Sequence, residues 1–106
     1  QRHDRVFYPF PVDNLKKVVV YIDNRRGLRP LVDVSVALYL TKNATLGNNY
    51  YERKLYSTIP AGGELVIPST DEIFQNACVG IGVGVYCYSA TDPSEVDYDI
   101  FIMGAV

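Results

Sequence analysis

The sequence is poor in histidine and cysteine. It contains one histidine, His3, and two cysteines, Cys78 and Cys87. A Ser-His-acid or Cys-His arrangement would therefore depend on a histidine close to Gln1. One histidine and two cysteines are also too few to supply the four ligands of a structural zinc site. We expect a protein that is not an enzyme and that holds no metal or other cofactor.

Long apolar runs are also absent. No run approaches the roughly 20 residues of a membrane helix, and no secretion signal is visible, so we expect no membrane span. The 106 residues are 48% hydrophobic and 21% charged, which predicts one globular domain. The sequence begins with Gln1 rather than methionine, which favours a processed or secreted chain.

The second half of the sequence has no basic side chain. Residues 55–106 hold seven acidic residues and no Lys or Arg, whereas residues 1–54 hold all ten Lys and Arg and five acidic residues. One interpretation is ion pairing between strands of a single domain. The other is a molecule with unlike poles that stacks on copies of itself. The net charge of −2 and the lack of a basic stripe predict no nucleic-acid partner.

What the sequence does contain is alternation of apolar and polar residues. In LVDVSVALYLT, residues 31–41, apolar side chains fill every second position from Val32 to Leu40, which predicts a strand with one buried face. The opposite face would carry Asp33, Ser35, Ala37, Tyr39 and Thr41. The β-branched run at residues 15–23 is expected to pair with it as a hairpin through residues 24–30.

Further strands are expected at residues 50–58, 64–68, 77–88 and 96–106, with a short helix at 69–75. This pattern predicts an all-β fold, a single antiparallel β-sandwich (jelly-roll or Ig-like) of about seven strands. The sandwich domain would span residues 14–106, after an extended N-terminal arm at residues 1–13. The layout resembles, in architecture, the small β-sandwich subunits of virion coats and extracellular filaments. The expected core comprises Val32, Val34, Val36, Leu38, Val79, Ile81, Val83 and Val85.

The stretch ACVGIGVGVYCY, residues 77–88, has glycine at every second position. A phosphate-binding loop needs its glycines in a turn that opens a helix, and no helix pattern follows. As a strand, one face is apolar and the other is bare and then aromatic, which indicates close approach by a neighbour. That neighbour is either a large side chain of the same domain or a segment of another subunit.

The same geometry separates the two cysteines. Nine residues of extended strand place Cys78 and Cys87 about 30 Å apart on opposite faces, whereas a disulfide needs Cα atoms within about 7 Å. We therefore expect two thiols that are unpaired or paired between chains, with Cys87 as a small core residue.

Several remaining features indicate contact with other molecules. In the arm, an apolar cluster beside two prolines could add to a sheet edge of another subunit or fold back as an edge strand of its own domain. The arginines of the 24–30 turn could meet the acidic residues of the last turn in a neighbour, which predicts salt-sensitive association. The residues expected at subunit interfaces are Val6, Phe7, Tyr8, Phe10, Arg25, Arg26, Arg29, Gly80, Gly82, Gly84, Tyr86, Tyr88, Asp92, Glu95 and Asp97.

Two local motifs carry weaker expectations. The tripeptide Asn43–Thr45 is a glycosylation sequon in a predicted loop, which agrees with an extracellular or virion location. The acidic residues from Asp92 to Asp99 either hold calcium or form a solvated turn, and their spacing matches no calcium-loop motif.

Together these features predict a non-enzymatic structural subunit that assembles with copies of itself, and with other structural proteins of the same assembly. The alternative is a carbohydrate- or ligand-binding β-sandwich module that uses its nine tyrosines.

Overall fold

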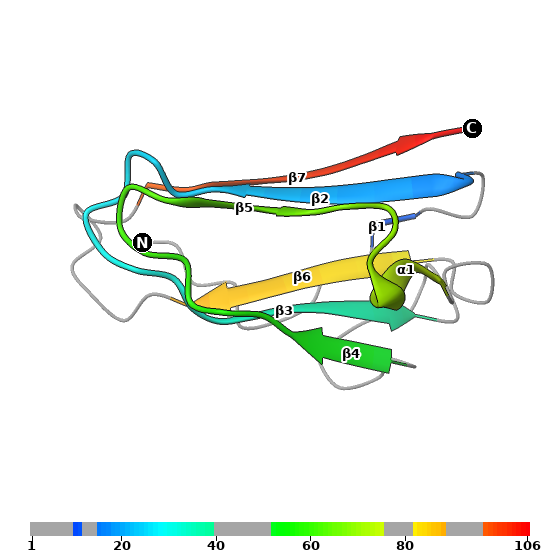
Figure 1. Ribbon diagram of the computed structural model, residues 1–106, viewed down its shortest axis with the longest axis horizontal. Coiled ribbons are helices and arrows are strands. Elements are labelled where there is room, and N and C mark those ends of the chain that lie inside the picture. Colours follow the sequence, from blue (N-terminus) through cyan, green and yellow to red (C-terminus); the bar gives the residue numbers. More distant parts are fainter. Residues whose placement is uncertain (1–9, 12–14, 40–51, 76–81, 89–96) are drawn as a thin grey trace.

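The computed structural model describes residues 10–11, 15–39, 52–75, 82–88 and 97–106. These residues form strands and one short helix (Figure 1). The elements are β1 (Phe10–Pro11), β2 (Lys17–Asp23), β3 (Val32–Tyr39), β4 (Glu52–Leu55), β5 (Glu64–Ile67), α1 (Glu72–Gln75), β6 (Gly82–Tyr88) and β7 (Asp99–Ala105). The prediction of a β-dominated fold is confirmed.

The strands form two antiparallel sheets. One sheet has the order β1-β6-β3-β4 and the other has the order β5-β2-β7. The two sheets lie one above the other in Figure 1, with α1 beside one end. No helix among the described residues is long and apolar enough to cross a membrane.

The hydrophobic core lies between the two sheets. The alternate residues Val18, Val20 and Ile22 of β2 are buried, and they belong to one cluster with buried residues of β3 and β6. Val34, Val36, Leu38 and Val83 are fully buried, as their alternation predicts. Cys87 is buried in the same cluster, in agreement with its expected role as a small core residue. Val79, Ile81 and the side chain of Val85 lie outside the described residues.

The predicted hairpin between residues 15–23 and 31–41 is wrong. β2 pairs with β5 and β7, whereas β3 pairs with β4 and β6. In a hairpin, both apolar faces would point to the same side of one sheet, and the other sheet would have to cover both of them. In separate sheets they face each other across the core, so each buries the other.

Buried Asn24 anchors the connection between these two strands. Its Nδ2 donates hydrogen bonds to the carbonyl oxygens of Arg29 (3.0 Å) and Pro60 (3.1 Å). Its own backbone carbonyl accepts from the amides of Gly27 and Gly62. A single polar side chain thus ties the segment that changes sheets to the turn before β5.

β3 does not alternate between buried and exposed positions as its sequence predicts. Ser35, Ala37 and Tyr39 are also fully buried, so both faces of this strand are covered from Val34 onward. The register with β6 shifts between Val32 and Ser35, and Asp33 there has a φ of 54°. Val32, at the start of this bulge, is only partly buried.

The short helix α1 is fixed to β4 through Asp71. The Oδ1 atom of Asp71 accepts hydrogen bonds from the Ile73 amide (3.1 Å), the Lys54 ammonium (3.0 Å) and the Tyr56 hydroxyl (3.0 Å). Burial alone would raise the pKa of Asp71, but these three donors lower it below its usual value. Asp71 therefore acts as an ionised N-cap that joins two elements.

Candidate functional site

The strongest candidate site is the outer face of the sheet β5-β2-β7, the face turned away from the core. Residues directly opposite each other in an antiparallel pair project to the same side. The register therefore places one row of side chains across two or three strands at each second position of β2. From one end to the other, the rows are Glu64–Asp23–Asp99, Val66–Tyr21–Phe101, Val19–Met103 and Lys17–Ala105.

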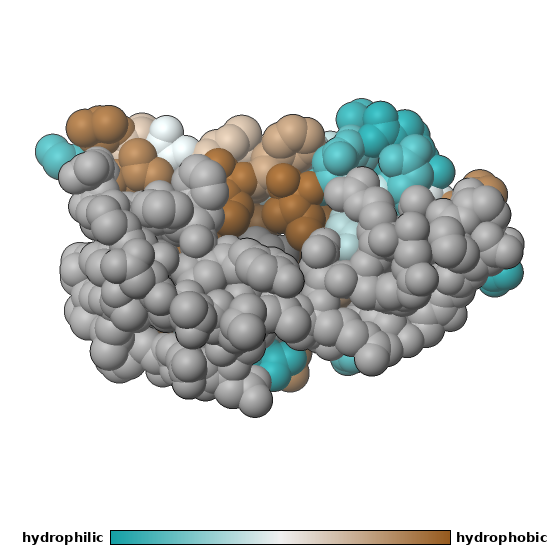
Figure 2. Space-filling model, turned by 180° about the vertical axis from the view of Figure 1, so that it is seen from behind, coloured by the Kyte–Doolittle hydropathy of each residue, from teal (hydrophilic) through white to brown (hydrophobic). Residues whose placement is uncertain are grey.

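The middle rows of this outer face are apolar and open to solvent. Val66, Phe101 and Met103 expose 54%, 46% and 48% of their surface. The Tyr21 and Phe101 rings stack with centroids 5.9 Å apart and planes 19° from parallel. Figure 2 shows apolar side chains along the side of the molecule that carries this sheet, with hydrophilic ones gathered toward one end. Adjacent exposed apolar side chains of this kind mark contact sites.

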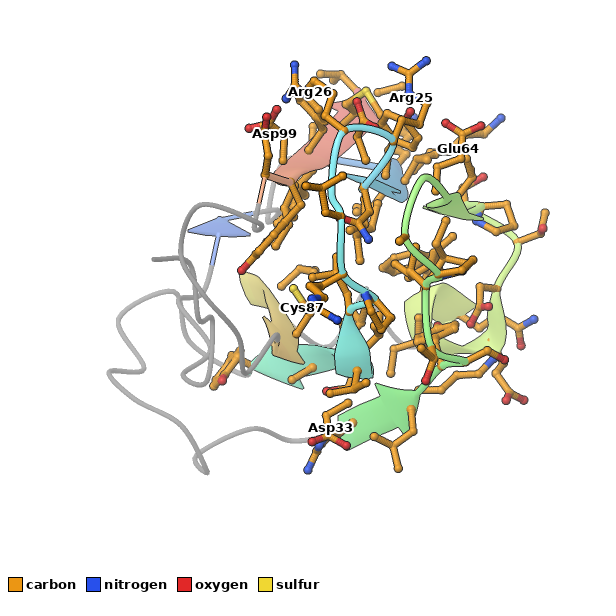
Figure 3. The ribbon with its side chains drawn as sticks, turned by 90° about the vertical axis from the view of Figure 1, so that its left-hand side faces the viewer. Arg25, Arg26, Asp33, Glu64, Cys87 and Asp99 are labelled. Atoms are coloured by element: carbon orange, nitrogen blue, oxygen red, sulfur yellow. The ribbon has the colours of Figure 1, made fainter. Side chains whose placement is uncertain are left out.

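The charged row and Asp97 beside it, which together we call the acidic end, are held by arginines of the 24–30 connection (Figure 3). Arg25 Nε and Nη2 donate hydrogen bonds to the two carboxylate oxygens of Asp23 at 3.0 and 3.1 Å. Arg25 Nε also lies 3.8 Å from Glu64 Oε2. The side-chain and backbone hydrogen bonds from Arg25 lower the pKa of Asp23 from 3.8 to about 2. Asp23 thus remains ionised over a wide pH range.

Arg26 pairs in the same way with acidic residues of the second half of the sequence. Its Nη2 lies 2.6 Å from Asp99 Oδ2 and 3.4 Å from Asp97 Oδ1. The bond to Asp99, together with the charges of both carboxylates, raises the pKa of the guanidinium. The ion pairs of Arg25, Arg26 and Lys54 thus join the basic and acidic halves within one chain, as the first of our two interpretations of the charge pattern predicts.

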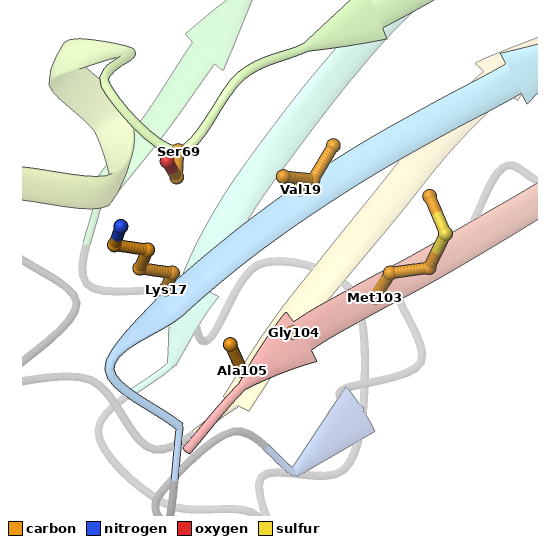
Figure 4. Close-up of a pocket in the computed structure, with 6 residues that line it drawn as sticks. All are labelled: Lys17, Val19, Ser69, Met103, Gly104 and Ala105. Carbon is orange, nitrogen blue, oxygen red and sulfur yellow. The ribbon is translucent and has the colours of Figure 1, made fainter.

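The other end of the outer face has a hollow of about 300 Å³ (Figure 4). Its lining is mainly apolar, with the stem and ammonium of Lys17 at its rim. The lining residues are Lys17, Val19, Ser69, Met103, Gly104 and Ala105. The absence of a side chain at Gly104 allows β7 to lie close to β2. A Cβ atom there would lie 2.7 Å from the Lys17 carbonyl oxygen. The hollow is large enough to accept an apolar side chain.

The predicted interface residues fall on different parts of the molecule. Arg25, Arg26 and Asp97 meet at the acidic end, whereas Arg29 is exposed in the connection. Gly82, Gly84, Tyr86 and Tyr88 lie in β6, in the four-stranded sheet, so the structure separates them from the arginines. The predictions for Val6, Phe7, Tyr8, Asn43, Gly80, Asp92 and Glu95 fall outside the described residues.

The strand assignment of the glycine stretch is confirmed for residues 82–88, because Gly82 and Gly84 pair with Tyr39 and Ala37 of β3. The other side of β6 is occupied by β1, where Phe10 is opposite Val83 and Pro11 is opposite Gly82. This edge of β6 is therefore filled, over these two residues, by the same chain.

The outer face contains five residues that were not predicted from the sequence as contact residues: Val19, Tyr21, Val66, Phe101 and Met103. A signal for them exists in β7, where DIFIMGA is apolar at both odd and even positions. A strand of this kind has apolar side chains on both faces, and only one face can line the core. Among the described residues, no three His, Cys, Asp or Glu side chains gather to form a metal site.

Comparison of this chain with protein-family models, with curated proteins and with solved structures found no match.

Proposed function

We propose that this chain is a non-enzymatic structural subunit that assembles with copies of itself. The subunit is a single antiparallel β-sandwich of jelly-roll or Ig-like type, and the assembly is an extracellular or virion structure such as a filament, a capsid or a capsid decoration. The observation that supports this proposal is the exposed apolar outer face of β5-β2-β7. Val66, Phe101 and Met103 leave about half of their surface in solvent there, which costs free energy unless a partner covers them.

The arm is a second proposed contact. β1 pairs Phe10 and Pro11 with β6 of the same chain, and the proposed contact with another subunit falls to residues 1–9. Val6, Phe7 and Tyr8 would supply its apolar side chains. Pro9 and Pro11 keep the segment extended and lower the entropy lost on docking.

The direct experiment measures the molar mass of the purified chain by light scattering across a range of protein and salt concentrations, with negative-stain imaging of any large species. We expect association that increases with concentration and weakens with salt. A chain that stays monomeric up to hundreds of micromolar contradicts the proposal.

Deleting residues 1–9, which leaves β1 intact, tests the arm separately. We expect the shortened chain to keep its unfolding temperature and to lose the larger assemblies. Loss of folding would show that the arm belongs to its own domain, and unchanged assembly would show that the arm is not a contact.

A carbohydrate-binding module remains the alternative, and the stacked rings of Tyr21 and Phe101 beside the acidic end favour it. Aromatic faces next to carboxylates and guanidinium groups suit the apolar faces and hydroxyls of a sugar. Titration calorimetry with a set of oligosaccharides tests this alternative. A saturable heat that Phe101→Ala abolishes, in a chain that remains monomeric, would favour the module over the structural subunit.

A further inference from the structure

The two ends of the outer face differ in charge. At the acidic end, the ion pairs among the described residues join four carboxylates, those of Asp23, Glu64, Asp97 and Asp99, to two guanidinium groups. The opposite end carries the exposed ammonium of Lys17 beside the hollow. Between the ends, the described strands carry the apolar and aromatic rows. A surface with this order of charges along its strands is complementary to a second copy whose strands run in the opposite direction.

We propose that two copies of this chain pair through their outer faces with strands antiparallel, about a two-fold axis that lies between the faces and crosses the strands. This inference rests on the proposed function and adds to it the surface and the orientation. A two-fold contact uses the same patch on both subunits, so the patch must complement itself. Rotation about this axis places Lys17 of each copy over the acidic end of the other.

The apolar rows also match in this arrangement. This axis places each strand over the same strand of the second subunit, running in the opposite direction. Phe101 of one β7 therefore lies over Met103 of the other. Aromatic rings and thioether sulfur atoms make favourable contacts. The hollow beside Met103 lies where the reversed copy brings Phe101, and two such sheets pack about 10 Å apart.

Charge selects this orientation over the parallel one. With strands parallel, the acidic end of one copy would lie over the acidic end of the second copy, and Lys17 would lie over Lys17. Like charges that face each other across an interface oppose association. Only the reversed orientation therefore brings opposite charges together at the ends of the outer face and apolar side chains together in its middle.

The size of the face sets the conditions of the test. Three strands at about 4.8 Å spacing and seven residues at about 3.3 Å each give a face of roughly 14 by 23 Å. This area, roughly 320 Å² per copy, is well below the roughly 800 Å² per partner that a standard specific interface buries. We therefore expect a weak dimer that sedimentation velocity detects at tens to hundreds of micromolar.

The first experiment compares Phe101→Glu and Val66→Glu with Leu55→Glu, which places the same charge on an exposed apolar residue of the other sheet (64% exposed, against 46% for Phe101 and 54% for Val66). We expect both outer-face variants to weaken the dimer by more than tenfold, because each would bury an unpaired charge. Leu55→Glu should leave the dimer unchanged. Unfolding temperatures check that all three variants remain folded.

The second experiment tests the orientation with Lys17→Gln and the neighbouring control Lys16→Gln. Lys16 precedes β2 and has the opposite parity, so it lies off the face. The antiparallel dimer loses an attraction in Lys17→Gln and should weaken several-fold, whereas a parallel dimer would lose a repulsion and tighten.

The outcomes separate this inference from the proposed function. If the wild-type chain is monomeric at all concentrations, both fail. If it associates, and Leu55→Glu disrupts the association while Phe101→Glu and Val66→Glu do not, the outer face is not the contact and self-assembly stands. Tightening by Lys17→Gln would overturn the antiparallel orientation alone.

Discussion

Tyr39 of β3 is the direct register partner of Gly82 of β6, and Tyr39 is fully buried. Paired residues of an antiparallel ladder project to the same face, with Cβ atoms about 5 Å apart. The bare backbone of Gly82 thus stands beside a large aromatic side chain of the same chain. This is the first of the two explanations that the alternating glycines suggested.

Gly82→Val should destabilise the protein by about 1–3 kcal/mol, because the branched side chain would crowd the face that Tyr39 fills. Urea denaturation measures this difference. In a Tyr39→Ala background, the same substitution should cost less, since the ring is absent. An equal cost in both backgrounds would show that the two positions do not interact.

Asn24 and Gly27 should show strong coupling. Asn24→Ala removes the donor to two carbonyl oxygens and should cost about 1–3 kcal/mol. Gly27→Ala would place a Cβ 2.0 Å from Asn24 Oδ1, so the amide would have to move. The double variant, measured by urea denaturation, should lose less stability than the sum of the two single variants. Additive losses would contradict this account of the turn.

Asp33 tests the strain at the bulge. A φ of 54° is costly for most side chains and free for glycine. We expect Asp33→Gly to change the free energy of unfolding by less than about 1 kcal/mol, and Asp33→Val to lower it by roughly 1–3 kcal/mol. Thermal and urea unfolding of the pair would measure this contrast. Equal stability of the two variants would show that the bulge relaxes at no cost.

Asp23 should make the protein sensitive to acid. Its pKa is about 2 in the folded chain and 3.8 as the ordinary value, so below pH 4 the unfolded chain takes up the proton first. The stability that the Arg25 pair contributes is therefore complete above pH 4 and is lost as the pH falls from 3.8 to about 2.

Urea unfolding at a series of pH values from 6 to 2 measures this loss. Asp23→Asn should be less stable at pH 6 and should lose less stability between pH 4 and pH 2. Asp33→Asn, which removes a carboxylate at a distance from Arg25, is the matched control (Figure 3). Parallel pH profiles for wild type and Asp23→Asn would contradict the role of this pair.

Individual strands were predictable because the alternation of apolar and polar residues that marks a strand lies within a short stretch of sequence. The pattern of residues 31–41 identified β3 and its core residues Val34, Val36 and Leu38. Pairing was not predictable, because a seven-residue connection can close a hairpin or cross between layers with equal ease. The burial of Ser35, Ala37 and Tyr39 was missed for a related reason, since alternation shows which face is more apolar and not whether the other face is covered.

The candidate site was predictable only in its charges. The acids and bases of the two halves were correctly recognised as potential partners, but Phe101 and Val66 become neighbours of Tyr21 only through the register of strands that are distant in sequence. No local pattern contains that register. The second apolar face of β7 was the one visible sign of it.

The pairing of β2 with β7 also determines when the protein can fold. Its register joins residues 17–23 to residues 99–105, so during synthesis β2 has only β5 beside it until β7 has been made. The edge of β2 that pairs with β7 remains without its partner strand for that interval. Acquisition of the native state is therefore completed after translation of residue 105, at the slow rate typical of β-pairing between distant segments, and the nascent chain is prone to aggregation until then.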